Sequence, residues 1–168
     1  MDVDLPFLVQ QLNEDHVAFE HPGVPGHPFE AREGDLIHVS EQAEQEGFGS
    51  VGLVIVDEDP AVHGDLLNVG RDLQGLVDLD TIILRSPTMV DVVSRTHHRA
   101  ELEIARHDLV QNLDPAAYPE QVAGFIHQVD GYSFPWGATG AVGIIALIAL
   151  LVTAWRQSIR RPAATTRP

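Results

Sequence analysis

The sequence predicts a small α/β domain, with a sheet of about three or four strands and helices on its faces, followed by a C-terminal transmembrane helix. Two apolar runs, residues 51–56 and 81–84, are rich in β-branched side chains and typical of strands buried on both faces of a parallel sheet. A helical stripe lies between them, which indicates a βαβ unit. A third apolar run near the C-terminus is long enough to cross a bilayer.

The first predicted helix follows Asp4, a residue type that favours the N-cap position, and Pro6 is tolerated in its first turn. Its apolar stripe consists of Leu5, Leu8 and Leu12. Residues 20–29 contain three prolines and two glycines, which remove backbone donors and loosen the chain. We therefore predict a loop or linker there.

Two further helices are predicted around the first buried strand. The helix before the strand ends at Gly47, because glycine suits a left-handed C-terminal cap. Its stripe consists of Leu36, Val39 and Ala43. The helix after the strand is the crossover of the βαβ unit, and its stripe consists of Leu66, Leu67, Gly70 and Leu73.

The remaining predicted elements are an edge strand and two helices. Residues 89–93 form the strand, since Asp91 interrupts the apolar run, and a tight hairpin joins it to residues 81–84. The stripe of the first helix consists of Leu102, Ala105, Leu109 and Leu113. Asp114 and Pro115 begin the second helix, whose stripe consists of Tyr118, Val122, Phe125 and Val129.

The charges are separated along the chain of 168 residues. All 25 acidic residues precede residue 131, where six arginines oppose them and leave a formal charge of −19. A surface this acidic repels phosphate backbones, so we expect no nucleic-acid binding. The chain has no cysteine, which excludes disulfide scaffolds, zinc–thiolate sites and thiol catalysis.

The uncharged stretch between Asp130 and Arg156 defines the predicted organisation. About 20 apolar residues span a hydrocarbon core of about 30 Å, and Trp136 and Trp155 lie where interfacial anchors belong. The sequence therefore predicts a soluble acidic domain at 1–130, a linker at 131–136, a transmembrane helix at 137–156 and a basic tail at 157–168.

Two observations disagree about topology. Residues 1–17 lack a basic region and an unbroken apolar core, so they do not resemble a secretory signal, which favours a cytoplasmic domain. The tail carries four arginines close to the span, and the positive-inside rule places such a tail in the cytoplasm. We favour the second observation and expect a single-pass protein of the cell membrane whose acidic domain lies outside.

Candidate site residues are expected at the carboxyl edge of the sheet. Asp57 and Asp59 follow the first buried strand, where open α/β sheets place ligands, and Arg85 and Ser86 follow the second. We expect this group to form a ligand or partner edge, in which a salt bridge between Arg85 and Asp57 closes the turn. A pair of carboxylates supplies few of the oxygens that Ca²⁺ needs, so we assign no metal, no cofactor and no catalytic residue.

The nine histidines show no metal-binding pattern in the sequence. His97 with Glu101, and Glu103 with His107, are one helical turn apart but lie in no HExxH motif. His21 and His27 lie in the proline-rich loop at a spacing with no known geometry.

The order of the elements resembles the TPM domain, a small α/β fold of membrane-anchored envelope and thylakoid proteins. The runs GLVIVDEDP, DLDTIILRSP and VDVVSRTHHRAELEIA are similar to small single-pass membrane proteins of high-GC Gram-positive bacteria, often encoded beside cell-wall hydrolases. TPM proteins include acid phosphatases and metal binders as well as assembly factors and accessory subunits, so the resemblance implies one of these roles. Many TPM domains carry an acidic pair and a glycine-rich stretch where this chain has Arg85-Ser86-Pro87 and Ser94-Arg95-Thr96.

These observations favour a membrane-anchored, non-catalytic interaction or regulatory module of the cell envelope. Its expected partners are the lipid bilayer and a protein, with the cell-wall hydrolase machinery as the candidate that the resemblance suggests. The alternatives are a metal-dependent phosphatase of the TPM type and a purely structural single-pass protein.

Overall fold

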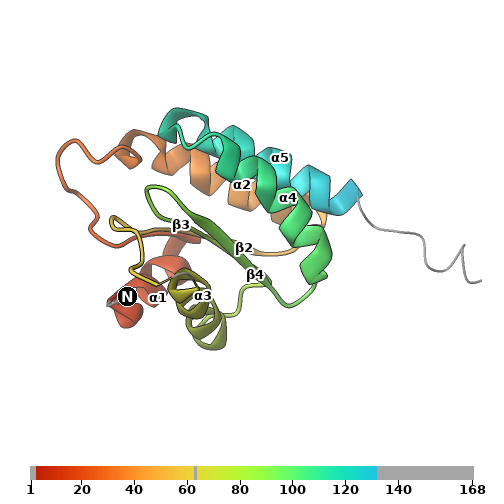
Figure 1. Cartoon of the computed structure of the whole chain (residues 1–168), viewed down its shortest axis with the longest axis horizontal. Coiled ribbons are helices and arrows are strands. Elements are labelled where there is room, and N and C mark those ends of the chain that lie inside the picture. The colour runs from red at the N-terminus through yellow and green to blue at the C-terminus, as the bar shows by residue number, and fades with distance from the viewer. Residues whose placement is uncertain (1–2, 63, 132–168) are drawn as a thin grey trace, which may run out of the picture. The chain divides into compact units, whose positions relative to one another are not determined.

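The computed structural model describes residues 3–62 and 64–131, which contain a four-stranded sheet and five α-helices (Figure 1). The elements are, in order, α1 (Leu5–Asp15), β1 (Val17–Phe19), α2 (Glu33–Glu46), β2 (Val51–Ile55), α3 (Asp65–Leu76), β3 (Thr81–Arg85), β4 (Val90–Ser94), α4 (Arg99–Gln111) and α5 (Tyr118–Gly131). Short 3₁₀ turns, Glu30–Arg32 and Pro115–Ala117, precede α2 and α5. These residues belong to one compact unit, Met1–Tyr132.

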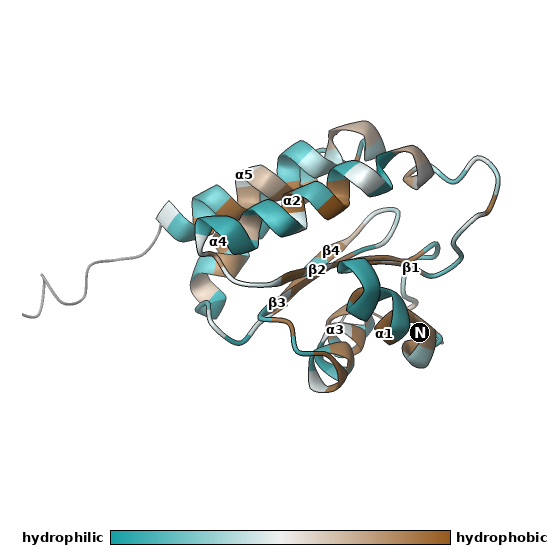
Figure 2. Ribbon diagram, turned by 180° about the vertical axis from the view of Figure 1, so that it is seen from behind, coloured by the Kyte–Doolittle hydropathy of each residue, from teal (hydrophilic) through white to brown (hydrophobic). Residues whose placement is uncertain are grey.

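The sheet has the order β1-β2-β3-β4, in which β1, β2 and β3 are parallel and β4 is antiparallel to β3. Helices α2, α4 and α5 cover one face, and α1 and α3 cover the other (Figure 1). Every residue of β2 and β3 is buried, as expected for strands covered on both faces. The ribbon of the strands is accordingly coloured mostly brown, for hydrophobic residues, whereas the helices alternate between brown and teal (Figure 2).

The predicted α/β architecture is confirmed, and the predicted caps of α1 and α2 are found, whereas Asp114 and Pro115 begin the 3₁₀ turn that precedes α5 and Leu113 lies beyond the end of α4. Asp4 caps α1 by accepting a hydrogen bond from the backbone N–H of Phe7 at 3.1 Å. Gly47 ends α2 with a φ of 90°, a conformation that glycine adopts without a steric cost. The βαβ unit, the β3–β4 hairpin and the edge position of β4 are also confirmed.

The sequence did not predict strand β1. The chain leaves α1 through His16, which has a φ of 68°, and at once forms β1 beside β2. Because β1 has only three residues, its apolar run is too short to show a period. The predicted loop at residues 20–29 follows it and contains no helix or strand, although the turn Glu30–Arg32 begins immediately afterwards.

The predicted transmembrane helix at 137–156 and the basic tail at 157–168 lie outside the described residues, as does the linker after Gly131. Among the helices that are described, none combines the length and the apolar character needed to span a bilayer. Gly131 itself, where the linker was expected to begin, is the last residue of α5.

Gly70 sets the distance between α3 and the sheet. A Cβ atom at this position would lie 2.5 Å from Leu84 Cδ1 and 3.3 Å from Val93 Cγ2, and Leu84 is fully buried. We expect Gly70→Ala to lower the free energy of unfolding by about 1–3 kcal/mol through overpacking. Chemical denaturation measures this loss.

Gly75 provides the matched control on the same helix, because a Cβ there meets no atom within 4 Å. Gly75→Ala should raise the free energy of unfolding by up to about 1 kcal/mol through helix propensity. Equal effects of the two substitutions would contradict the close approach of α3.

Candidate functional site

The parallel strands bring three loops to one edge of the sheet. Phe19 pairs with Ile55, and the N–H of the next residue, Glu20, donates to the Ile55 carbonyl at 2.9 Å. Asp57 follows β2 at the same edge, where its own N–H donates to Glu20 Oε2 at 2.9 Å. Two residues far apart in the sequence are thereby held side by side.

Asp57 is the centre of a cluster with two histidines. Its Oδ2 lies 2.7 Å from Nδ1 of His21, and its Oδ1 lies 2.9 Å from Nε2 of His27. The His21 side chain is 64% exposed, whereas the His27 side chain is only 10% exposed. One histidine of the cluster is thus accessible and the other is part of the packed structure.

His27 is held in one orientation by its surroundings. The backbone N–H of Phe29 donates to its Nδ1 at 3.3 Å, so in the neutral ring the hydrogen belongs to Nε2. The Nε2–H group then donates to Asp57. The Phe19 ring meets the imidazole edge-on at a centroid distance of 5.6 Å, and the Phe29 ring lies at 6.0 Å.

Asp59 has a different role from Asp57. Its carboxylate accepts hydrogen bonds from the Ser86 hydroxyl at 2.6 Å, from the Thr88 N–H at 2.9 Å and from the Thr88 hydroxyl at 2.8 Å. The hydrogen bond from Ser86 holds the pKa of Asp59 below its ordinary value, and those from Thr88 act in the same direction. Asp59 therefore fastens the loop after β2 to the hairpin after β3.

Arg85 does not form the predicted salt bridge with Asp57. Its side chain is buried, its guanidinium lies over the rings of Phe29 and Tyr118 at 4.9 and 4.4 Å, and Nη2 donates to the Leu113 carbonyl. Nε and Nη1 have no partner among the described residues. The guanidinium is thus held by aromatic rings and a backbone carbonyl at the end of β3.

Burial changes the acid–base properties of this packed group. Removal from water lowers the pKa of Arg85, because it penalises the charged form, and it raises the pKa of the fully buried Tyr118. The Tyr118 hydroxyl also has no partner within the described part of the chain. Arg85 therefore acts as a packed cation–π element.

A cavity of about 220 Å³ opens between these groups. The polar residues that line it include His27, Asp57, Arg85 and Ser86. The apolar residues that line it include Phe29 and Leu113. Three of the four predicted edge residues, all but Asp59, thus line one cavity at the expected edge.

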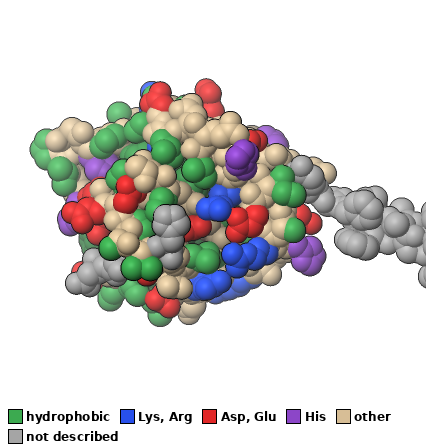
Figure 3. All heavy atoms as spheres, in the orientation of Figure 1, with side chains coloured by type: hydrophobic (Ala, Val, Ile, Leu, Met, Phe, Trp, Pro, Cys, Tyr) green, Lys and Arg blue, Asp and Glu red, His purple; other side chains and the backbone are tan. Residues whose placement is uncertain are grey.

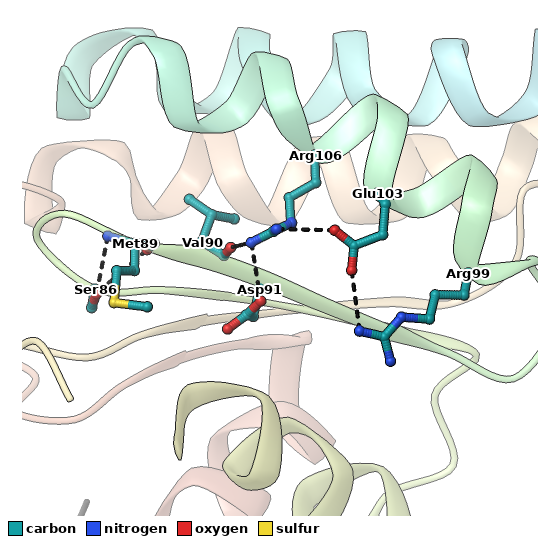
Figure 4. Close-up of polar contacts among 7 residues, drawn as sticks. All are labelled: Ser86, Met89, Val90, Asp91, Arg99, Glu103 and Arg106. Carbon is teal, nitrogen blue, oxygen red and sulfur yellow. Dashed lines mark hydrogen bonds and ion pairs between the residues drawn. The ribbon is translucent and has the colours of Figure 1, made fainter. Parts of the chain in front are cut away.

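A second polar group occupies the outer edge of the sheet, between α4 and β4. Arg106 Nη1 donates to the Val90 carbonyl at 2.8 Å and lies 3.1 Å from Asp91 Oδ1 (Figure 4). Its Nη2 donates to Glu103, which also pairs with Arg99 (Figure 4). Several arginine side chains lie close together on the face shown in Figure 3, and Arg71, Arg99 and Arg106 line one pocket.

Comparison of the sequence with known proteins shows the family to which the chain belongs. Residues 1–167 match the family described as "Membrane protein Rv1476". The chain belongs to the Rv1476 membrane protein family. A protein of Mycobacterium tuberculosis (strain ATCC 25618 / H37Rv) with the same description is 29% identical over 129 residues, which cover 74% of this chain and 64% of that protein.

Membership of the Rv1476 family confirms the expectation of a membrane protein. The matched segment covers less than two thirds of the mycobacterial protein. The likeness to TPM domains, the single-pass topology and the envelope context stay predictions.

The structure divides the four predicted site residues among three sets of contacts, with Arg85 packed on aromatic rings, and adds two histidines that the sequence did not predict there. Ser86 pairs with Asp59, while Asp57 pairs with His21 and His27. One signal for the histidines was available: their loop directly follows an apolar Val-Ala-Phe run. Had that run been identified as a strand parallel to residues 51–56, the loop would have been predicted at the edge that carries Asp57.

Asp59→Asn should lower the free energy of unfolding by about 1 kcal/mol at pH 7. The substitution replaces a carboxylate by an amide that accepts fewer hydrogen bonds, and the effect is modest because residue 59 is exposed. The folded-state pKa of Asp59 is depressed, so its contribution is present above the ordinary pKa of 3.8 and is lost as pH falls through the folded value. Denaturation at several pH values should therefore show the difference from wild type shrinking below about pH 4.

Glu58→Gln is the control, since it removes a neighbouring exposed carboxylate. It should change the free energy of unfolding by less than about 0.5 kcal/mol. A deficit of Asp59→Asn that stays constant with pH would contradict the assigned role.

Proposed function

We propose that this member of the Rv1476 family is a membrane-anchored, non-catalytic interaction or regulatory module of the cell envelope. In this proposal the apolar segment at 137–156 holds the protein in the bilayer, the acidic domain lies outside the cell and the basic tail lies in the cytoplasm. The family description supports the membrane location. The four arginines of the tail support the orientation.

The surface of α2 is the observation that carries the proposal. Its exposed carboxylates are Glu33, Asp35, Glu41, Glu44 and Glu46. The helix itself contains no lysine or arginine, and the arginine at its N-cap, Arg32, pairs with Asp35 at 3.2 Å. Three other arginines, Arg71, Arg99 and Arg106, line a separate pocket beside β4. A helix surface of a single charge sign attracts a protein with a basic surface.

The charge distribution also explains why we favour binding over phosphoryl transfer. Phosphoryl transfer needs cations around the phosphoryl group, because they stabilise its negative charge in the transition state. At the carboxyl edge of the sheet, Arg85 is buried against aromatic rings and Asp59 is bonded to the hairpin. We expect no phosphate release from an aryl phosphate with Mg²⁺, Mn²⁺ or Ca²⁺. Turnover abolished by Asp57→Asn would favour the phosphatase alternative.

Partner binding should depend on α2 and on salt. We expect pull-down from solubilised membranes to recover a partner with the full-length chain but not with the triple variant Glu33→Gln, Glu41→Gln, Glu44→Gln. Binding should weaken as salt rises above about 0.15 M, where the Debye length is about 8 Å.

A matched triple variant, Glu14→Gln, Glu58→Gln, Asp72→Asn, removes the same charge from other exposed positions. It should retain the partner. Equal loss in both triple variants would indicate a general charge effect, and retention in both would contradict a role for α2. Recovery of the same partner by a chain that lacks the acidic domain would support the purely structural alternative.

The topology can be tested because the chain has no cysteine. Gln45 is exposed on α2, so Gln45→Cys in intact cells should react with a membrane-impermeant maleimide. Thr166→Cys in the tail should react only after permeabilisation. The reverse pattern would place the acidic domain in the cytoplasm.

A further inference from the structure

We infer that Glu20, His21 and Asp57 form a binding site for a divalent transition-metal ion, with Zn²⁺ as the reference ion. This inference is independent of the proposed interaction function. It depends on side chains that two neighbouring strands bring together at the carboxyl edge of the sheet.

The three side chains have the geometry of a nearly assembled site. One potential ligand atom from each residue lies within 4.8 Å of the other two. A tetrahedral ion with bonds of about 2.1 Å places its ligand atoms about 3.4 Å apart, so small side-chain movements suffice to close the site. The 2.7 Å contact between His21 Nδ1 and Asp57 Oδ2 is a hydrogen bond in which Nδ1–H donates. An ion between these atoms takes the place of that hydrogen, which in the neutral ring moves to Nε2 and leaves the Nδ1 lone pair for the metal.

The backbone and a neighbouring ring hold the two carboxylates in place. The Asp57 N–H donates to Glu20 Oε2, which leaves Oε1 of the same carboxylate for an ion. His27 Nε2–H donates to Asp57 Oδ1, so the other oxygen, Oδ2, faces His21. Hydrogen-bonded carboxylates of this kind are usual around metal ligands.

His27 is a positioning residue in this arrangement. Its Nδ1 accepts from the Phe29 N–H, so its Nε2 carries the hydrogen and has no lone pair to offer a metal ion. The nearly buried ring between Phe19 and Phe29 cannot turn freely. His27 therefore orients Asp57, and His21 supplies the imidazole ligand.

The ligand types select among ions. An imidazole with two carboxylates suits Zn²⁺ and similar transition metals, whereas Mg²⁺ and Ca²⁺ prefer sites made of oxygen alone. The two carboxylates neutralise the charge of the ion. Since the Asp57 side chain is 29% exposed and that of His21 is 64% exposed, water can reach the ion and complete its coordination.

The test uses the untagged full-length chain in detergent micelles, freed of metal with a chelator. We expect isothermal titration with Zn²⁺ to show one equivalent bound. Asp57→Asn and His21→Asn should each weaken binding at least about 100-fold through loss of a ligand, and His27→Gln about 10-fold through loss of orientation. A tenfold excess of Mg²⁺ or Ca²⁺ should not compete.

Two controls separate this site from general attraction to an acidic protein. Asp59→Asn removes a carboxylate two residues from Asp57, and His127→Asn removes an exposed imidazole on α5. Both should bind Zn²⁺ as the wild type does. Thermal denaturation of each variant shows that it is folded.

Nuclear magnetic resonance of the histidine rings gives a second readout, in which Zn²⁺ should shift the His21 resonances and leave those of His127 unchanged. Absence of saturable binding would overturn the inference, as would binding that is unaffected by Asp57→Asn and His21→Asn in folded protein. Competition by Mg²⁺ or Ca²⁺ at equal strength would also overturn it.

Discussion

Parallel pairing of β1 with β2 is the constraint on which the rest of the carboxyl edge depends. The register that sets Phe19 opposite Ile55 also sets Glu20 beside the chain that leads to Asp57. A shift of one residue would turn Val17 and Phe19 from the core under α2, α4 and α5 toward the core under α1 and α3. The same step would separate the histidine loop from its carboxylate, so core packing and site geometry are fixed together.

The sequence was sufficient for elements whose apolar patterns are long, and it failed where the decisive contacts are distant in the chain. Residues 51–56 and 81–84 predicted the buried strands, because a strand covered on both faces must be apolar throughout. The expected edge for Asp57, Asp59, Arg85 and Ser86 followed from strand direction. The hydrogen-bond partners of these residues could not be predicted. His27 reaches Asp57 only because β1 pairs with β2, and the three residues of β1 are too few to show a recognisable period in the sequence.

Arg85 shows how a side chain expected at a polar edge can serve packing instead. The guanidinium joins the end of β3 to Phe29 in the long loop and to Tyr118 at the start of α5. Phe29 in turn bonds His27 through its N–H, so the order of the loop depends on the aromatic contacts beneath it. A buried cation of this kind costs desolvation energy, and contact with two rings and one carbonyl offsets part of that cost.

The polar contacts along β4 bear on the behaviour of the protein at high concentration. An uncovered edge strand is a template on which another chain can extend the sheet, and such growth leads to fibrils. Here Arg106 occupies the Val90 carbonyl and pairs with Asp91, so an incoming strand would have to displace a guanidinium. At the opposite edge, β1 offers only three residues for pairing. Both margins of the sheet thus resist intermolecular growth, which favours a domain that stays dispersed at high concentration.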